Sequence, residues 1–409
     1  FLSPQGFARY RGLIPTRGSR WRYLKRRCRG HGRGVVKHSG KRTFQAWPIV
    51  SSVVLGMCHT GYVRNAARIP GVKYSPIPDS TMAGIAVDAM GGDRAPVEIV
   101  YGAVDAARRG IDVVLVGDVA VLDPILDDAG ISLPIAHADE VVEMADDPAR
   151  AIREKKHSSI AVAAKLVADG EVGGLVSAGS TGAAMASAAL IIGRLPGVSR
   201  PAIASLLPNE KVLLDSGANL SCRAEDLVQF SIMGAVLARI HYHVSLPRVG
   251  LINIGEEEGK GRDLEKQVHG LLARTDGIDF VGNIDGRDLA RDTAEVLVTD
   301  GFVGNVVLKT VEGTARWVLS VLQESLSGKD LEKAVRDIGP ELKDLRKSFD
   351  PDTFGGAHLL GTKGVVVVAH GSSSRRAIAN AIDLGAEGIR DDLVPKIGSG
   401  ISELSSVSE

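Results

Sequence analysis

Three segments of the sequence place glycine and small polar side chains directly after a short apolar run. The first spans residues 177–183, the second begins at Asp300, and the third begins at His370. Such turns suit an anion, because glycine lets the backbone approach a ligand and the first N–H groups of a helix attract negative charge. Each turn alone could equally be an ordinary strand-to-helix connection with serine or threonine as a cap. Three of them in one chain favour a site for phosphate.

A fourth segment, residues 253–262, is rich in charged side chains. It combines Asn253 with Glu256, Glu257, Lys260 and Arg262. By itself this pattern is more typical of a charged, solvated loop than of a site.

A repeated unit must position these turns: a short β-branched run, a glycine-rich polar loop and a segment of helical period. The apolar runs read IAVDAM, IDVVLVG, GGLVSA, KVLLDSG, RVGLINIG, IDFVGNI, AEVLVTDG and GVVVVAHG. Runs this continuous are expected of a parallel sheet that is covered on both faces. The sequence therefore predicts an α/β fold with a doubly wound, mostly parallel sheet and helices on both faces. In such sheets ligands bind beyond the carboxyl ends of the strands, where the turns are expected.

Two common nucleotide motifs are missing from the sequence. No G-x-G-x-x-G follows an apolar run, and the pattern G-x-x-x-x-G-K-[ST] does not occur. A nicotinamide dehydrogenase and an ATPase are thereby disfavoured.

Charge divides the 409 residues into two unlike parts. Lys plus Arg and Asp plus Glu both number 49, but about 16 of the bases and only one acid, Asp79, precede Met82, so the rest carries a net charge near −15. Residues 1–81 show no sustained period, and we expect a leader or a mis-assigned N-terminus with Met82 as the true start. A nucleic-acid arm and an organellar presequence are the alternatives. Residues 82–400 are predicted to form the α/β domain, and 401–409 a flexible tail.

Cysteine usage and hydropathy indicate a reducing, cytoplasmic compartment. Cys28, Cys58 and Cys222 lack the spacing of a disulfide framework or a zinc site. The longest early apolar run, residues 48–57, is about half of what spans a bilayer. We expect no metal, no cofactor and no nucleic-acid partner.

Eight ordered motifs resemble one known family, the bacterial phosphate acyltransferases called PlsX. They are IAVDAMGGDRAP, VSAGSTGAAMASA, GRLPGVSRPAIAS, LLDSGAN, PRVGLINIGEEEGKG, FVGNIDGRD, TDGFVGNVVLKTVEG and FGGAHLLGTKGVVVVAHGSS. The resemblance covers about residues 85–384 and implies a Rossmann-like, isopropylmalate dehydrogenase-like fold with a projecting helical hairpin at 312–349. It departs at Ser180, where the family usually has Asn, and at Asp285, where it usually has Glu.

The resemblance implies transfer of a long-chain acyl group from acyl carrier protein to inorganic phosphate, which gives an acyl phosphate. This product feeds a membrane glycerol-3-phosphate acyltransferase at the start of phospholipid synthesis. Family members are similar in being homodimers that bind the membrane surface peripherally. The implied partners are therefore the carrier protein, phosphate, the membrane enzyme, the membrane surface and a second copy of the chain.

The implied reaction brings a phosphate anion to a thioester whose carbonyl becomes an oxyanion, so cations and aimed N–H groups are the main requirement. The phosphate-binding candidates are Ser177, Gly179, Ser180, Thr181, Gly182, Asp300, Gly301 and Asn305. The catalytic candidates are Lys260, Asn253, His370 and Lys309, with Lys260 foremost. Candidates for binding substrate or carrier are Asp88, Gly91, Gly92, Asp93, Asn219, Glu256, Glu257, Arg262, Arg287, Gly371 and Ser372.

Two surfaces are expected to meet partners. Lys260, Arg262, Lys266 and Arg287 are the predicted basic landing surface for the acidic carrier protein. Apolar residues between 312 and 349 recur at helical spacing, which alone favours core or dimer interface over lipid contact. This apolar set comprises Trp317, Val318, Val321, Leu322, Leu331, Val335, Ile338, Leu342 and Leu345.

Three other functions remain open on the sequence. A serine hydrolase would use Ser180, Asp300 and His370, which run in the order of an α/β-hydrolase triad. A related acyltransferase would take coenzyme A thioesters, and a non-enzymatic phosphate sensor would use the same turns. Cys222 is expected to be a packed small residue, although a lowered thiol pKa beside Arg223 is the alternative.

Overall fold

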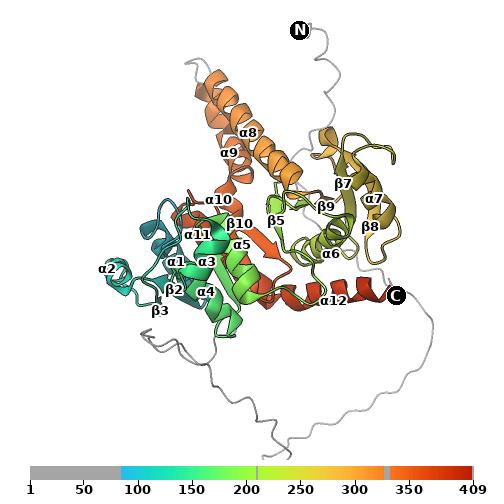
Figure 1. Cartoon of the computed structure of the whole chain (residues 1–409). Coiled ribbons are helices and arrows are strands. Elements are labelled where there is room, and N and C mark those ends of the chain that lie inside the picture. Colours follow the sequence, from blue (N-terminus) through green and yellow to red (C-terminus); the bar gives the residue numbers. More distant parts are fainter. Residues whose placement is uncertain (1–83, 209–210, 327–331, 408–409) are drawn as a thin grey trace, which may run out of the picture. The chain divides into compact units, whose positions relative to one another are not determined.

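One mixed sheet organises the part of the chain that the computed structural model describes, residues 84–208, 211–326 and 332–407 (Figure 1). Its strands are β1 (Ile85–Asp88), β2 (Val113–Gly117), β3 (Ile135–His137), β4 (Gly174–Ser177), β5 (Ala202–Leu207), β6 (Lys211–Leu214), β7 (Arg248–Asn253), β8 (Asp279–Asp285), β9 (Val296–Val298), β10 (Gly356–Leu360) and β11 (Val365–Ala369). They lie in the order β3-β2-β1-β4-β11-β10-β5-β6-β9-β7-β8. The expected leader, residues 1–81, lies outside the described residues.

The direction of the strands reverses in the middle of the sheet. Strands β3, β2, β1, β4 and β11 are mutually parallel, and so are β6, β9, β7 and β8. Between these halves, β10 is antiparallel to both neighbours and β5 is antiparallel to both of its own. The strands of the two parallel halves therefore run in opposite directions, and their carboxyl ends lie at opposite ends of the strands' common axis.

Helices cover both faces of the sheet, as the sequence predicts. They are α1 (Val97–Arg108), α2 (Val119–Ala129), α3 (Pro148–Glu154), α4 (Ser159–Ala168), α5 (Thr181–Ser187), α6 (Ala224–His241), α7 (Asp263–Leu272), α8 (Gly301–Ser325), α9 (Glu332–Ser348), α10 (Pro351–Phe354), α11 (Arg375–Arg390) and α12 (Leu393–Val407). Successive residues of a strand face opposite sides. Ile85 accordingly packs in one apolar cluster with Ile99 of α1, whereas Ala86 packs in another with Ala163 of α4.

Helices α8 and α9 extend beyond the sheet in Figure 1 and correspond to the predicted hairpin, which begins at Gly301 rather than at 312. On α8 the side chains of Trp317 and Val318 are 66% and 51% exposed. The interpretation of this stripe as core is therefore wrong for these residues. Leu331 and the side chain of Val335 lie outside the described residues.

Two further sequence expectations differ from the structure. The predicted tail from residue 401 is helical, because α12 continues to Val407 and the side chain of Ile401 is fully buried. Strands β3, β5 and β10 are also absent from the predicted apolar runs.

One buried histidine in β10 links the fold to pH. His358 is 2% exposed, and its Nδ1 has no hydrogen-bond partner among the described residues. Burial, and after it the charge of His241, lowers the pKa of His358 from 6.5 to about 4. Between these two values the unfolded chain binds a proton at this site that the folded chain does not.

We predict that lowering the pH from 6.5 towards 4 reduces the free energy of unfolding through this group, by up to about 1.4 kcal/mol per pH unit. In urea unfolding measured across this pH range, the free energy of unfolding of His358→Phe should fall less steeply with pH than that of the parent protein. The exposed His157→Phe is the matched control and should follow the parent. Equal slopes for the parent and His358→Phe would contradict the assignment.

Candidate active site

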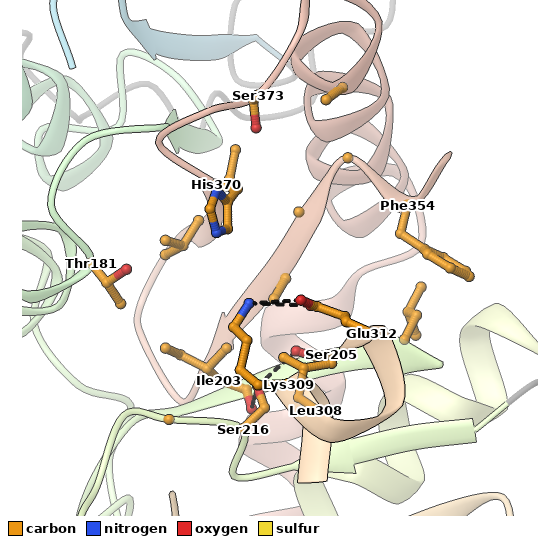
Figure 2. A pocket seen from close by; sticks show the side chains of 18 of the residues that line it. Thr181, Ile203, Ser205, Ser216, Leu308, Lys309, Glu312, Phe354, His370 and Ser373 are labelled. Atoms are coloured by element: carbon orange, nitrogen blue, oxygen red, sulfur yellow. Dashed lines mark hydrogen bonds and ion pairs between the residues drawn. The ribbon is translucent and has the colours of Figure 1, made fainter. Parts of the chain in front are cut away.

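A cavity of about 530 Å³ lies over the middle of the sheet, where the strand direction changes. Its lining comes from β5, β10, the end of β11, the start of α5 and one side of α8. Figure 2 shows Lys309, Glu312 and His370 around it, together with Thr181 and Phe354. Of the predicted site residues it collects Asp93, Gly179, Thr181, Asn305, Lys309, His370 and Gly371. In α/β sheets ligands bind outside the carboxyl ends of strands, and Gly179 and His370 follow the carboxyl ends of β4 and β11.

The turns after β1 and β4 meet at one wall of this cavity through buried hydrogen bonds. The Ser177 hydroxyl donates to Asp88 Oδ2 at 2.7 Å and accepts the Gly179 N–H at 3.1 Å. A Cβ added at Gly91 would lie 2.5 Å from Asp88 Oδ2 and 3.0 Å from Gly179 Cα, so only glycine fits this approach. Ser177 and Asp88 therefore hold the Gly179 turn in place and do not themselves line the cavity.

Asp88 is a supporting carboxyl group rather than a ligand. It is 2% exposed, and burial raises its pKa, while hydrogen bonds from Ser159 and Ser177 act in the opposite direction. Its second oxygen, Oδ1, has no hydrogen-bond partner among the described residues. The prediction that Asp88 binds substrate or carrier directly does not fit this burial.

The remaining residues of these turns are placed by local contacts. Ser180 caps α5 by accepting the Ala183 N–H at 3.4 Å. A Cβ at Gly182 would meet the ring of Pro148 on α3 at 2.6 Å, so the start of α5 packs closely on α3. Gly92 takes a positive φ of 116°.

The turn after β11 brings an imidazole to the cavity. The Asp93 N–H donates to the Gly371 carbonyl at 2.8 Å, which ties this turn to the one after β1. His370 Nδ1 lies 2.8 Å from the Ser372 hydroxyl and accepts the Ser372 N–H at 3.4 Å. Because Nδ1 accepts this N–H, the neutral ring carries its proton on Nε2. His370 can thus offer an N–H donor to a ligand.

Helix α8 supplies the lysine of the cavity. Lys309 Nζ lies 3.0 Å from a carboxylate oxygen of Glu312, and both side chains line the cavity (Figure 2). Asn305 lies one turn earlier, beside Gly217. A lysine held at a cavity wall by one carboxylate can take a second anion, because ammonium has three donors.

Asp300 and Gly301 anchor α8 instead of lining the cavity. Asp300 is 3% exposed, accepts the Val303 N–H as the helix cap, and pairs with Arg262 at 2.6 Å. The Gly301 N–H donates to the Asn219 carbonyl at 2.8 Å. A Cβ at Gly304 would lie 1.8 Å from the Asp215 carbonyl oxygen, so a glycine is required where α8 crosses the turn after β6.

Asn219 is also structural. Its N–H and its side-chain amide both donate to Asp215 Oδ2, and the amide also donates to the Pro201 carbonyl. Asp215 Oδ1 accepts N–H groups from Ile203, Gly217 and Ala218. This buried carboxylate fixes the turn that places Ser216 and Gly217 in the cavity wall.

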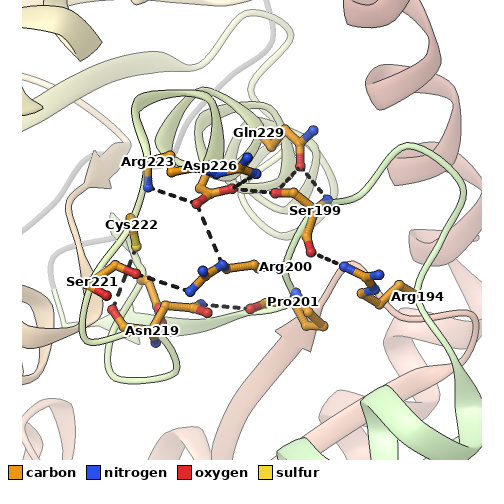
Figure 3. Close-up of polar contacts among 11 residues, drawn as sticks. Arg194, Ser199, Arg200, Pro201, Asn219, Ser221, Cys222, Arg223, Asp226 and Gln229 are labelled. Carbon is orange, nitrogen blue, oxygen red and sulfur yellow. Dashed lines mark hydrogen bonds and ion pairs between the residues drawn. The ribbon is translucent and has the colours of Figure 1, made fainter.

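Cys222 lies in the same connection, beside the salt-bridged pair Arg223 and Asp226 shown in Figure 3. Burial raises the pKa of its thiol to about 12, and the negative charges of Asp215 and Asp226 act in the same direction. Cys222 packs against the main apolar cluster, as predicted, and the shift of its pKa is opposite to the lowered pKa given as the alternative.

The charged loop after β7 lies apart from the cavity. None of its described residues is among those that line the cavity. Asn253 donates to the Lys260 carbonyl and caps its own turn through the Ile254 N–H. Lys260 Nζ lies 4.0 Å from Glu257 on the surface, and Arg262 is bound to Glu265 and Asp300. The catalytic roles predicted for Lys260 and Asn253 therefore find no support in this placement.

Two further predicted carrier contacts are on the surface. Glu256 is exposed, and Arg287 pairs with Asp285 at 3.0 Å. The side chain of Arg287 is 71% exposed, so it is accessible but locally neutralised.

Several lining residues were not foreseen. Ser205 and Ser216 share a hydrogen bond of 2.7 Å, and Glu312 orients Lys309. Apolar side chains complete the lining of the cavity: Leu206, Leu207, Leu308, Val311, Phe349 and Phe354. For Glu312 the sequence does contain a signal, because it follows Lys309 by three residues and such a spacing favours an ion pair on a helix.

The hydrolase alternative does not fit these positions. Ser180 caps α5, His370 Nδ1 contacts Ser372, and Asp300 pairs with Arg262. A triad requires a carboxylate at the Nδ1 side of the histidine. Within the described ranges we find no group of three or more side chains suited to a metal ion and no helix long and apolar enough to cross a bilayer.

Comparison with known proteins places the chain in a family. A sequence profile described as "Fatty acid synthesis protein" matches residues 83–396. A phosphate acyltransferase of Pelotomaculum thermopropionicum is 47% identical over 327 residues, 78% of this chain and 95% of the relative. That of Desulforamulus reducens is 46% identical over 334 residues, 80% of this chain and all of the relative. The chain belongs to this phosphate acyltransferase (PlsX) family, and it is an acyltransferase.

A solved structure supports the fold independently. A phosphotransacetylase from Streptococcus pyogenes matches with a TM-score of 0.51 at 16% identity, over 77% of this chain and 95% of that one. At this identity the likeness concerns the fold alone, and the predicted α/β architecture is confirmed.

We predict that Ser177→Ala lowers kcat/KM for phosphate about tenfold, because the Gly179 turn loses its anchor while Asp88 stays buried. Ser187→Ala is the matched control: its hydroxyl is also buried but donates within α5 to Ala184. Both variants should lose about 1 kcal/mol of unfolding free energy in urea. Equal kinetic effects in the two variants would show that the turn needs no such anchor.

Proposed function

We propose that the cavity transfers a long-chain fatty acyl group from an acyl carrier protein thioester to inorganic phosphate, giving an acyl phosphate for phospholipid synthesis. The observation that carries this proposal is that one cavity is lined by both polar and apolar side chains. Lys309, His370 and Thr181 line it together with leucine and phenylalanine side chains. Phosphate and an acyl chain are together the ligands such a cavity fits.

Phosphate binding is assigned to the polar residues that line the cavity. Lys309 supplies positive charge and Thr181 supplies a hydroxyl, beside the backbone of the Gly179 turn. The first N–H groups of α5 have no acceptor within the helix. Asp93, Glu312 and Asp352 also line the cavity, so Lys309 alone does not neutralise their charge. The backbone N–H groups of the Gly179 turn and of the start of α5 must supply further stabilisation when the anion binds.

Transfer then needs no nucleophile from the enzyme. A phosphate oxygen attacks the thioester carbonyl carbon and forms the new C–O bond. The carbonyl oxygen becomes an oxyanion, which the Nε2–H of His370 is suited to stabilise. Collapse of this intermediate breaks the C–S bond, and the thiolate leaves with the electron pair. Direct transfer in a ternary complex follows, and no acyl-enzyme should form.

The exposed apolar side chains of α8 are assigned to partners outside the active site. Phe302, Val306, Trp317 and Val318 are each more than half exposed. Large apolar side chains exposed on a projecting helix are often part of an interaction site. We assign it to the membrane surface, where the membrane glycerol-3-phosphate acyltransferase takes up acyl phosphate, with a second copy of the chain forming a homodimer.

The direct test is mass detection of acyl phosphate from acyl carrier protein thioester and phosphate. Lys309→Ala should raise the KM for phosphate about tenfold or more, because the cavity loses its lysine. Lys396→Ala, an exposed lysine of α12, is the control and should behave as the parent. The sequence instead favours Lys260, so Lys260→Ala belongs in the same series. A larger loss in Lys260→Ala than in Lys309→Ala would overturn the assignment to this cavity.

A further inference from the structure

A second concave surface carries positive charge at some distance from the cavity. It has a volume of about 420 Å³ and lies between α3, α4 and the π-helical turn Ala188–Ile192 that continues α5. Its apolar lining residues are Ile152, Ala161, Leu190 and Ile191, and its basic lining residues are Arg153, Lys156 and Lys165. We call this set of residues the basic groove.

The charges of the basic groove are only partly neutralised. Lys165 pairs with Asp169 at 2.7 Å. Arg153 and Lys156 are exposed and form no ion pair or hydrogen bond with any residue that the structure describes. Two free cations stand out in a chain whose residues after Met82 carry a net charge near −15. A partner that seats here must be acidic.

The apolar lining of the basic groove adds an apolar contact to this charge. Leu190 is 49% exposed, whereas Ile152 and Ala161 are buried. A π-helical turn is rare and is frequent at functional sites. One exposed leucine beside a small apolar surface can contact a single apolar side chain of a partner helix. This surface offers too little apolar area to enter a bilayer.

The same helical segment lines both the basic groove and the active-site cavity. Thr181, the first residue of α5, lines the cavity, and Leu190 lies nine residues further along the same continuous helical segment. At about 1.5 Å per residue the two are roughly 14 Å apart. Pro148, at the start of α3, packs on Gly182, and α3 ends beside Arg153. A protein docked here sits within reach of an extended prosthetic arm.

The landing surface predicted from the sequence is less suitable. Each of its cations already has an acidic neighbour: Lys260 has Glu257, Arg262 has Glu265 and Asp300, Lys266 has Asp263, and Arg287 has Asp285. These pairs leave no surplus of positive charge for an acidic protein. The basic groove retains such a surplus.

We infer that the basic groove is the docking surface for the protein part of the acyl donor, an acidic helical face that places one apolar side chain against Leu190. This inference rests on the proposed function, because it takes the donor to be carried by a protein. The carboxylates of that helix pair with Arg153 and Lys156, while its thioester arm enters the cavity.

The test compares two donors, an acyl carrier protein thioester and the same acyl group on pantetheine. Arg153→Glu should raise the KM for the carrier donor about tenfold, with kcat at saturation and turnover of acyl-pantetheine unchanged. Arg274→Glu, an exposed arginine of the other half of the sheet, is the control for charge reversal. Arg153→Lys should restore the parent KM, and the effect of Arg153→Glu should shrink at high salt.

The outcomes separate the two proposals. If the parent enzyme releases no thiol from the carrier donor but uses acyl-pantetheine, the proposed donor is wrong. The proposed docking surface is then wrong as well. If the parent uses the carrier donor and Arg153→Glu has the same KM as Arg274→Glu, only the docking surface is overturned. Loss of binding to anionic vesicles with an unchanged carrier KM would assign the groove to lipid and overturn it as well.

Discussion

The reversal of strand direction at β10 and β5 is the constraint on which the site depends. A sheet that stayed parallel would gather all its strand-end turns at one edge. Here the carboxyl ends of the two halves face opposite edges, and the cavity forms over the antiparallel strands between them. One half contributes the Gly179 turn and His370, and the other contributes Lys309 from α8. Candidate site residues from the two halves of the sheet thus line one cavity.

The charge of the cavity depends on which nearby carboxylates are buried in the protein and which line the cavity. Asp88, Asp215 and Asp300 are all buried and serve as anchors for turns or for the start of α8. They fix backbone positions without facing a ligand. Glu312 does face the cavity, and it holds Lys309 there. For the proposed phosphate ligand this lysine is already oriented, which reduces the entropy lost on binding.

The sequence predicts the fold well where strands are continuous apolar runs, as in β2 and β11. It misses β5 and β10, because Ser205 and His358 interrupt the apolar pattern and their burial depends on neighbouring strands. Without these two strands the reversal cannot be inferred. In a wholly parallel sheet, Lys260 and Arg262, which follow β7, would lie at the same end of the sheet as the Gly179 turn, which follows β4. Lys309 and His370 were among the candidates since each follows an anion-suited turn.

A crystal structure of the protein with bound phosphate tests the central claim most directly. The account predicts phosphate in the cavity over β5 and β10, against the Gly179 turn and within hydrogen-bond distance of Lys309 Nζ. Phosphate held by Lys260 and Arg262, with the cavity filled only by solvent, would contradict it.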